Sequence, residues 1–232
     1  MNTNSNTYTV IYSIILVVVV AAVLAFAAMF LKPTQDANVK KDTIGQILTA
    51  ATFAGVEDAA ILDTYKAEIE SAILVNLEGE KVGDLNIEDC EVYGTSDLKK
   101  QIAAEQKSLP VYIFKNGYTV VPCYGAGLWG PIWGYLALES DKNTIYGAYF
   151  SHKGETPGLG AEISTPKFQS QFVGKHIFRD GNLVSVAVVK PGKIAEGKDY
   201  VDGIGGGTIT SQGVDNMMLE SLNSYKDFLT TK

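Results

Sequence analysis

The sequence has few cysteines, histidines and arginines. Its two cysteines, Cys90 and Cys123, allow one disulfide bridge at most, which excludes a disulfide framework and a cysteine-only metal site. Its two histidines, His152 and His176, have no carboxylates and cysteines nearby in a metal-binding pattern, so no metal site is expected. Arg179 is the single arginine, and 19 Lys+Arg against 26 Asp+Glu give a formal net charge of −7. The chain therefore lacks the basic surface that binds nucleic acid.

Long apolar runs are also scarce, with one exception near the N-terminus. Every residue from Val10 to Leu31 except Ser13 is apolar, and no other stretch approaches the ~18 residues of a membrane span. This excludes a polytopic membrane protein. Charged residues make up only 19% of the chain and aromatic residues 10%, which excludes intrinsic disorder.

The apolar run predicts a transmembrane helix. As a helix, residues 10–31 would be about 33 Å long, enough to cross a ~30 Å hydrocarbon core. A cleaved signal peptide is the alternative, because Ala25-Phe26-Ala27 resembles a cleavage site. No Lys or Arg precedes the run and it continues past this site, so an uncleaved anchor is expected. The lysines within residues 32–41 would by themselves place the following domain in the cytoplasm.

The rest of the chain predicts one α+β domain. Residues 1–9 form a short tail, 10–31 the span, 32–41 a polar stalk and 42–232 the domain. A helix is expected from Asp42, with Gly55 as its stop signal. Its apolar face would be Ile44, Ile47, Leu48 and Ala51.

Alternation predicts strands at 111–114, 134–138 and 144–150, the last two joined by a turn at 140–143, and an apolar run at 183–189 predicts a buried strand. The last expected element is an amphipathic helix. Its apolar face is Val214, Met217, Met218, Leu222, Tyr225 and Leu229. Strands and helices without a regular βαβ rhythm, repeat or second linker favour a single α+β domain.

Three glycine-rich segments are candidate binding elements. The first, 125–134, carries Trp129 and Trp133, which would either stack on a flat ligand or fill the core. The second, 152–160, carries Glu155 and Thr156, which are expected on an exposed turn. The third, 202–213, directly precedes the last helix.

The third segment suits an anion. Consecutive glycines let backbone N–H groups converge, and the start of a helix adds free N–H groups and a positive dipole end. Thr210 or Ser211 is a plausible N-cap, and a phosphate near Thr208 would be well placed. The alternative is a flexible connection that ends in a capped helix. The segment matches neither a Walker A loop nor a dinucleotide fingerprint.

Together these segments resemble a known family, the FMN-binding domain of the C subunit of the sodium-translocating NADH:quinone reductase. The family carries a flavinylation motif, Asp-x-x-Ser/Thr-Gly-Ala-Thr-x-Ser/Thr-Ser, whose threonine takes FMN through a phosphoester bond. Residues 202–211, Asp-Gly-Ile-Gly-Gly-Gly-Thr-Ile-Thr-Ser, fall on this motif and place Thr208 at the acceptor position. Gly205 replaces the usual Ser/Thr and Gly207 the usual Ala, and both leave room for the phosphate.

The resemblance covers nearly the whole chain. It includes the N-terminal span and the segments 127–129, 155–160, 171–175 and 189–190. Gly-Leu-Trp at 127–129 favours the C subunit over the related G subunit of the Rnf complex. The residues that the resemblance implies around the flavin are Trp129, Glu155, Thr156, Gly158 and Leu159 as walls of the isoalloxazine, Lys190 near the flavin, and Gly206, Gly207 and Thr210 beside the acceptor Thr208.

The resemblance implies a covalent-FMN electron carrier, not a complete enzyme and without a catalytic residue of its own. It would act in a membrane complex that couples electron transfer from NADH to quinone to sodium translocation. A separate flavin transferase, using FAD and magnesium, would attach the FMN outside the bacterial cytoplasmic membrane. The domain would therefore be periplasmic, and this implication is preferred here to the weak charge bias of the lysines.

The implied partners are the other subunits of a six-subunit complex. They include a second covalent FMN, an iron–sulfur centre and an NADH-oxidising subunit. Two alternatives stay open at this point. One is an Rnf-type G subunit, which couples ferredoxin to NAD⁺, and the other is a membrane-anchored assembly or binding subunit without flavin.

Overall fold

A single helix, α1 (Asn6–Ala50), contains the whole apolar run. The computed structural model describes residues 5–53, 55–104 and 106–231, and its contacts divide them after Val39 into two parts, which are described separately. The N-terminal part of α1 has a stretch of mean hydropathy 3.2 and is long and apolar enough to cross a membrane. Pro33 lies inside the helix without ending it.

The C-terminal end of α1 belongs to the folded domain. The separate helix expected from Asp42 is this end of α1, because residues 34–41 contain no glycine or proline to interrupt it. The predicted apolar face is confirmed, since Ile44, Ile47, Leu48 and Ala51 are at most 1% exposed. The helix ends at Ala50, earlier than the predicted stop at Gly55, and Thr52 takes a left-handed φ of 64°.

A truncation series would test this division. We expect a chain that begins at Asp36 to fold and a chain that begins at Thr52 to be strongly destabilised. The shorter chain loses the buried side chains of Ile44, Ile47 and Leu48, each worth ~1.5–3 kcal/mol, out of a typical total stability of ~5–15 kcal/mol. Urea unfolding followed by circular dichroism measures the difference. Equal midpoints for both chains would contradict the prediction.

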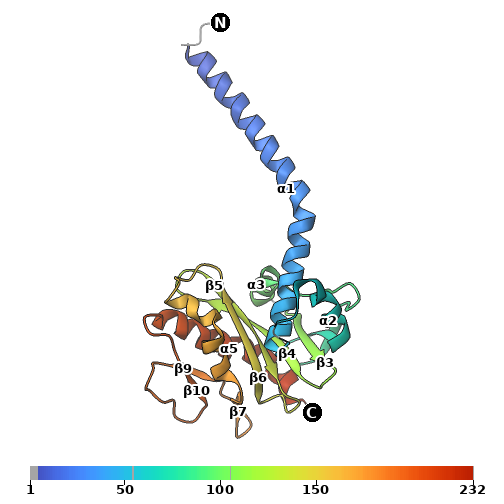
Figure 1. Ribbon diagram of the computed structural model, residues 1–232, viewed down its shortest axis with the longest axis vertical. Coiled ribbons are helices and arrows are strands. Elements are labelled where there is room, and N and C mark those ends of the chain that lie inside the picture. Colours follow the sequence, from blue (N-terminus) through green and yellow to red (C-terminus); the bar gives the residue numbers. More distant parts are fainter. Residues whose placement is uncertain (1–4, 54, 105, 232) are drawn as a thin grey trace. The chain divides into compact units, whose positions relative to one another are not determined.

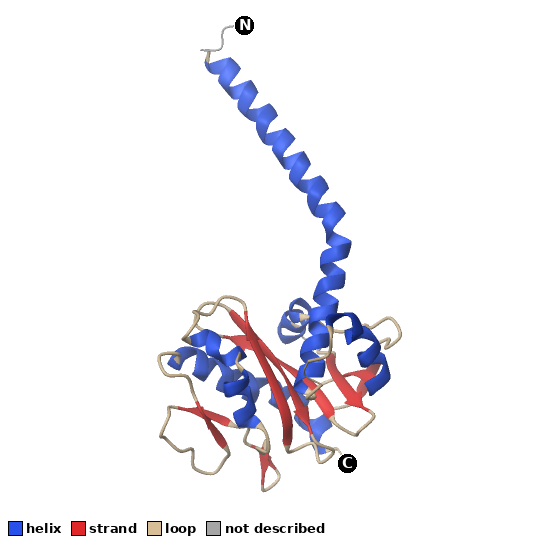
Figure 2. Ribbon diagram, in the orientation of Figure 1, coloured by secondary structure: helices blue, strands red, loops and turns tan. Residues whose placement is uncertain are grey.

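Six strands form one antiparallel sheet in the order β2-β1-β3-β4-β5-β6 (Figures 1 and 2). They are β1 (Ile69–Val75), β2 (Lys81–Asp84), β3 (Leu109–Phe114), β4 (Thr119–Ala126), β5 (Pro131–Leu138) and β6 (Ile145–His152). The strands predicted at 111–114 and 134–138 are confirmed within β3 and β5. The strand predicted at 144–150 is confirmed as β6, except that Thr144 makes only an isolated bridge with His176.

Helices cover both faces of the sheet, which confirms the α+β class (Figure 1). The end of α1 and α2 (Ile61–Glu68) lie on one face, and α5 (Thr208–Thr230) lies on the other. α3 (Thr95–Ala103) precedes β3, and η1 (Asp58–Ala60) precedes α2. The sheet has a hydrophobic core on each face, and successive residues of a strand point into different cores. In β3, Val111 belongs to the core with α5, and Tyr112 belongs to the core with α1. The predicted alternation therefore reflects a sheet with two buried faces.

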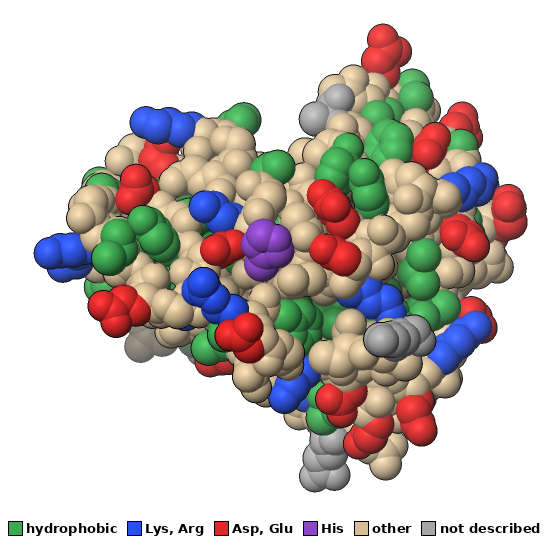
Figure 3. All heavy atoms as spheres, turned by 90° about the horizontal axis from the view of Figure 1, so that it is seen from below, with side chains coloured by type: hydrophobic (Ala, Val, Ile, Leu, Met, Phe, Trp, Pro, Cys, Tyr) green, Lys and Arg blue, Asp and Glu red, His purple; other side chains and the backbone are tan. Residues whose placement is uncertain are grey.

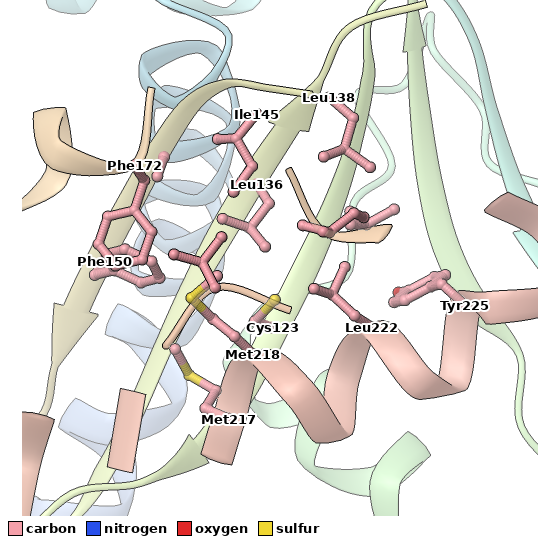
Figure 4. Packing of buried hydrophobic residues seen from close by; sticks show 14 of the residues in the cluster. Cys123, Leu136, Leu138, Ile145, Phe150, Phe172, Met217, Met218, Leu222 and Tyr225 are labelled. Atoms are coloured by element: carbon pink, nitrogen blue, oxygen red, sulfur yellow. The ribbon is translucent and has the colours of Figure 1, made fainter. Parts of the chain in front are cut away.

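The predicted apolar face of the last helix is confirmed in α5. All six of its predicted core residues, from Val214 to Leu229, are at most 5% exposed. In Figure 4, Met218 and Leu222 lie beside Cys123 of β4. The hydroxyl of Tyr225 donates a hydrogen bond to the carbonyl of Pro110 at 3.0 Å. These contacts fix the position of α5, and with it the position of its first residue, Thr208.

The two cysteines are free and lie in different cores. Cys90 packs in the cluster with α1, and Cys123 in the cluster with α5, on the opposite face of the sheet. The one disulfide that the composition allows is therefore not formed. Burial raises the pKa of the Cys123 thiol to about 12, despite a hydrogen bond with Ser221 that lowers it, so this thiol stays protonated at neutral pH.

The segment between β6 and α5 is built from short elements. They are η2 (Gly160–Ser164), α4 (Pro166–Gln169), η3 (Ser170–Phe172), β7 (Phe178–Arg179), β8 (Asn182–Leu183), β9 (Ala187–Val189) and β10 (Tyr200–Asp202). The single strand predicted at 183–189 is wrong. Ser185 takes a φ of 56° and breaks the run, so that β8 pairs with β7 and β9 pairs with β10. Acidic and basic side chains are interspersed on the face drawn in Figure 3, without a broad basic field.

Candidate functional site

Three glycine-containing loops meet beside the start of α5 and line an open pocket of about 230 Å³. They follow β4, follow β6 and precede α5, so the tertiary fold brings together the three segments singled out in the sequence. The pocket is lined by Leu128, Trp129, Glu155, Thr156, Leu159, Gly160, Gly206, Gly207, Thr208, Ile209 and Thr210. Most of the residues expected around a flavin therefore share one pocket.

The rim of this pocket is apolar and exposed. Trp129 is 68% exposed, and Leu128, Leu159 and Ile209 are between 43% and 59% exposed. Such surfaces suit a flat aromatic ligand. Leu128 and Ile209 were not predicted as site residues, although both lie inside the motifs that located their neighbours.

Trp133, the other tryptophan considered as a stacking residue, lies elsewhere. Its side chain packs against the core on the α1 face of the sheet. The indole Nε1 donates a hydrogen bond to Oε1 of Gln46 at 2.9 Å. Trp129 lies in the loop before β5 and Trp133 within the strand, so their four-residue spacing does not place them on a common face.

Glu155 is buried, and the prediction that it lies on an exposed turn is wrong. Its side chain is 4% exposed, whereas the neighbouring Thr156 is exposed as predicted. Oε1 accepts a hydrogen bond from the backbone N–H of Trp129 at 2.8 Å, and Oε2 accepts one from the hydroxyl of Thr210 at 2.6 Å. These two donors offset the loss of hydration, and they allow the carboxylate to join the loops that follow β4 and β6 to the first turn of α5.

Two glycines make room for this carboxylate. A Cβ at Gly127 would lie 2.5 Å from Oε1 of Glu155, and a Cβ at Gly160 would overlap Oε2 and the hydroxyl of Thr210. Any side chain at either position would displace the junction. Gly158, with a φ of 74°, forms the predicted turn but lines a neighbouring hollow of about 640 Å³.

The acceptor candidate Thr208 is the first residue of α5. Gly207 occupies the N-cap position, and no side chain in the described part of the chain caps this helix. The predicted N-caps are wrong because both hydroxyls have other partners: Thr210 donates to Glu155, and Ser211 accepts from the N–H of Ile204 at 2.9 Å. The N–H groups of the first turn of a helix have no partner inside the helix, and here no described side chain caps them. They therefore favour an anion next to Thr208.

A second hollow, of about 570 Å³, also borders Thr208. It is lined by Lys190 and Lys193 among others, and both side chains are exposed. Lys190 therefore does not share the pocket of Trp129. The two hollows have in common Thr208 and Gly206, which belongs to the acceptor loop, residues 203–207. The lysines add positive charge to the hollow that they line with Thr208.

These residues fit a flavin mononucleotide. FMN has a flat, largely apolar ring and an anionic phosphate at the opposite end. At Thr208, the first residue of a helix, the site borders one hollow with an exposed apolar rim and a second hollow lined by two lysines. Gly206 takes a φ of 78° and lies against the side chain of Leu159, whereas at Gly205 a Cβ would meet nothing within 4 Å among the described residues, so the loop is open at Gly205.

Comparison with known proteins agrees with this geometry. The profile of the FMN-binding domain family matches residues 127–223, which include the pocket and the start of α5. The C subunit of the Na(+)-translocating NADH-quinone reductase of Haemophilus ducreyi is 36% identical over 227 residues, covering 91% of this chain and 87% of that protein.

Two solved structures share the fold. The crystal structure of the C subunit of the Na(+)-translocating NADH-quinone reductase from Parabacteroides distasonis matches with a TM-score of 0.79 and 47% identity, over 87% of this chain and 98% of that one. Shewanella oneidensis NqrC matches with a TM-score of 0.68 and 29% identity, over 83% of this chain and 97% of that one. The chain therefore belongs to the family of C subunits of the Na(+)-translocating NADH-quinone reductase and contains an FMN-binding domain.

Proposed function

We propose that this chain carries FMN covalently on Thr208 and passes electrons within a sodium-translocating NADH:quinone reductase. The observation that carries the proposal is the position of Thr208, an exposed hydroxyl at the first residue of a helix, between an apolar pocket and a lysine-lined hollow. Membership of the NqrC family favours this function over that of an Rnf-type G subunit.

Attachment through the phosphate would use only the Thr208 hydroxyl of this chain. A bond forms between its oxygen and the phosphorus of the FMN half of FAD, and the bond from that phosphorus to the adenylate breaks. AMP leaves and the hydroxyl proton is lost, so no oxidation or reduction accompanies the transfer. A separate flavin transferase with magnesium would supply the catalytic groups, because the two hollows beside Thr208 hold no histidine among the described residues and their one carboxylate, Glu155, is engaged by Trp129 and Thr210.

The pocket residues would hold and orient the ring. Trp129, Leu159 and Ile209 offer apolar surfaces, and Glu155 fixes the loops that carry them. The two lysines of the second hollow would neutralise the phosphodiester. When bound, FMN supplies the electron-transfer chemistry, and the chain supplies its position and electrostatics.

The site is suited to an exchange of electrons between proteins. A volume of about 230 Å³ lies below the ~300–1,000 Å³ of pockets that enclose their ligands, so part of the ring would remain accessible. A covalent bond retains the cofactor without burial. An accessible ring edge allows close approach of a redox partner, whereas a substrate would need enclosure.

We further propose that α1 anchors the protein in the bacterial cytoplasmic membrane with the domain in the periplasm, among the other subunits of a six-subunit complex. The apolar helix supports the anchor. The side of the membrane is the one that the sequence resemblance implies, and it is opposite to the charge bias of the lysines after the span. We expect alkaline phosphatase fused after Lys232 to be active in cells. An inactive phosphatase fusion, with an active cytoplasmic reporter at the same position, would contradict this.

Intact-mass measurement of the chain purified from its native host tests the flavin proposal. We expect the mass of the chain to increase by that of FMN less one water, and a fluorescent band in a denaturing gel under ultraviolet light. Peptide mapping should locate the addition on Thr208. An unmodified mass would favour an assembly or binding subunit without flavin.

A further inference from the structure

The loop that carries the acceptor is rich in glycine yet is firmly held at both ends. Residues 203–207 contain a single side chain beyond hydrogen, that of Ile204, and glycine has the largest conformational freedom of any residue. A loop of this composition would by itself present Thr208 in many orientations. The hydrogen bonds at its two ends determine how far this freedom is reduced.

At the N-terminal end, the side chain of Gln171 pairs with the backbone of Asp202. Its Oε1 accepts a hydrogen bond from the Asp202 N–H at 3.0 Å, and its Nε2 donates one to the Asp202 carbonyl at 3.2 Å. On the opposite edge, Asp202 lies in parallel register with Val189 of β9. The carboxamide of Gln171 thus takes the place of a neighbouring strand and holds the last residue of β10 from its free side.

Gln171 is itself fixed to the central sheet. The next residue, Phe172, is fully buried, and its ring lies edge-on to Phe150 of β6 with centroids 5.0 Å apart. The side chain of Gln169 also donates to the carbonyl of Phe150 at 3.0 Å. Packing and hydrogen bonding against β6 therefore fix the position of Gln171, and the hydrogen bonds of Gln171 fix that of Asp202.

At the C-terminal end, the loop is closed onto α5. The N–H of Ile204 donates to Oγ of the buried Ser211 at 2.9 Å, and the N–H of Gly207 donates to the carbonyl of Ile204 at 3.0 Å. Between Asp202 and Thr208, Gly205 and Gly206 are exposed, and among the described residues their backbone N–H groups donate no hydrogen bond to another part of the backbone or to a side chain. Thr208 comes directly after Gly207.

We propose that Gln171 is a positioning residue for the attachment of FMN to Thr208, with Ser211 as the second anchor of the same loop. The proposal rests on the proposed function. In the transfer, the Thr208 oxygen must meet the phosphorus in line with the bond to the departing AMP, and the hydroxyl proton leaves to a base of the transferase or to water. Holding the loop at both ends limits the orientations of this oxygen before the transferase binds, which lowers the entropy cost of reaching that geometry.

The test is the rate of FMN attachment to the full-length chain in detergent, with purified flavin transferase, FAD and magnesium. Gln171→Met keeps the length of the side chain and removes both hydrogen bonds. We expect kcat for attachment to fall about tenfold, because misplacement of a reacting group has effects of this order or larger, while KM for the acceptor chain changes by less than about twofold. Gln171→Glu keeps the hydrogen bond from the Asp202 N–H, so its kcat for attachment is expected to lie between those of the wild type and Gln171→Met.

Gln101→Met is the matched control. Gln101 also holds a loop through its carboxamide, since its Oε1 accepts from the N–H of Ser108 at 2.8 Å, but it lies in α3. Its variant should lose a similar amount of stability and keep the wild-type kcat. A kcat that falls equally in the Gln101 and Gln171 variants would show a general loss of stability and would overturn the proposal.

The other possible results of the attachment experiment also decide whether Gln171 positions Thr208. If the wild-type chain is modified on Thr208 and Gln171→Met is modified equally fast, Gln171 does not position the acceptor and the proposed function stands. If the wild-type chain takes no FMN on Thr208, both proposals are wrong. Should Gln171→Met fail to fold, Gln171→Glu decides by the same comparison: a reduced kcat with an unchanged melting temperature supports positioning, and a wild-type kcat overturns it.

Discussion

The Thr208→Ala chain is expected to fold normally and to carry no covalent FMN. Thr208 is exposed at the first residue of α5, where loss of a hydroxyl changes stability by no more than ~0.5 kcal/mol. The same hydroxyl is the proposed acceptor of the phosphoester. The fluorescent band in a denaturing gel should disappear, and the assembled complex should lose its NADH-dependent quinone reduction, while the melting temperature stays close to that of the wild type.

Thr208→Ser is the matched control, because it keeps a hydroxyl at the same position. It should retain at least part of the FMN, whereas the isosteric Thr208→Val should retain none. Thr210 and Ser211 cannot substitute, since both are buried and their hydroxyls are engaged by Glu155 and Ile204. A fluorescent band that persists in Thr208→Ala would remove the basis for the assignment.

Glu155→Ala is expected to have the second large effect, on the stability of the domain. It removes the acceptor of a buried hydrogen bond from the hydroxyl of Thr210 and of a partly buried one from the N–H of Trp129. Leaving these donors without a partner should lower the free energy of unfolding by about 2–4 kcal/mol. Urea unfolding measures this directly, and a loss below ~1 kcal/mol would contradict the role assigned to the carboxylate.

Glu162→Ala provides a comparison for this variant. Its carboxylate accepts one bond from the N–H of Gly158 at 3.2 Å near the surface, so its loss should cost less than ~1 kcal/mol. FMN should remain on Thr208 in a folded Glu155 variant, because Glu155 does not form the tether. Loss of a negative charge beside the ring should raise the reduction potential of the flavin. Unchanged potential in both Glu155→Gln and Glu155→Ala would show that the carboxylate only fastens the loops.

The sequence was most informative where a local pattern is buried on one side. The spacing of Met217, Met218 and Leu222 predicted the inner face of α5, and alternation located the strands that became β3, β5 and β6. β1 and β4 were not predicted. β4 is buried on both faces over most of its length, and the burial pattern of β1 is irregular. Neither strand therefore shows the alternation of apolar and polar residues that distinguishes a strand from a helix in the sequence.

Local patterns failed where the outcome depended on contacts between distant segments. Glu155 follows a lysine and a glycine and precedes a turn, which is typical of an exposed loop, yet Trp129 and Thr210 provide donors that make its burial favourable. Ser211 has the residue type and spacing of a helix cap. It accepts instead from Ile204, since the loop folds back onto the first turn of α5.

The sequence by itself determined the apolar run of α1, the α+β class, the family and the acceptor candidate Thr208, because each depends on residue types at short spacing along the chain. Only the tertiary structure decided how the site is assembled. It placed Lys190 and Trp129 in two different hollows beside Thr208, turned Glu155 inward as the junction of two loops and α5, and brought Gln171 to the free edge of β10. The physical reason is that the buried carboxylate of Glu155 is stable only when its hydrogen-bond donors are present, and these donors lie 26 and 55 residues away along the chain. The partner of the half-exposed Gln171 is likewise distant, 31 residues along the chain.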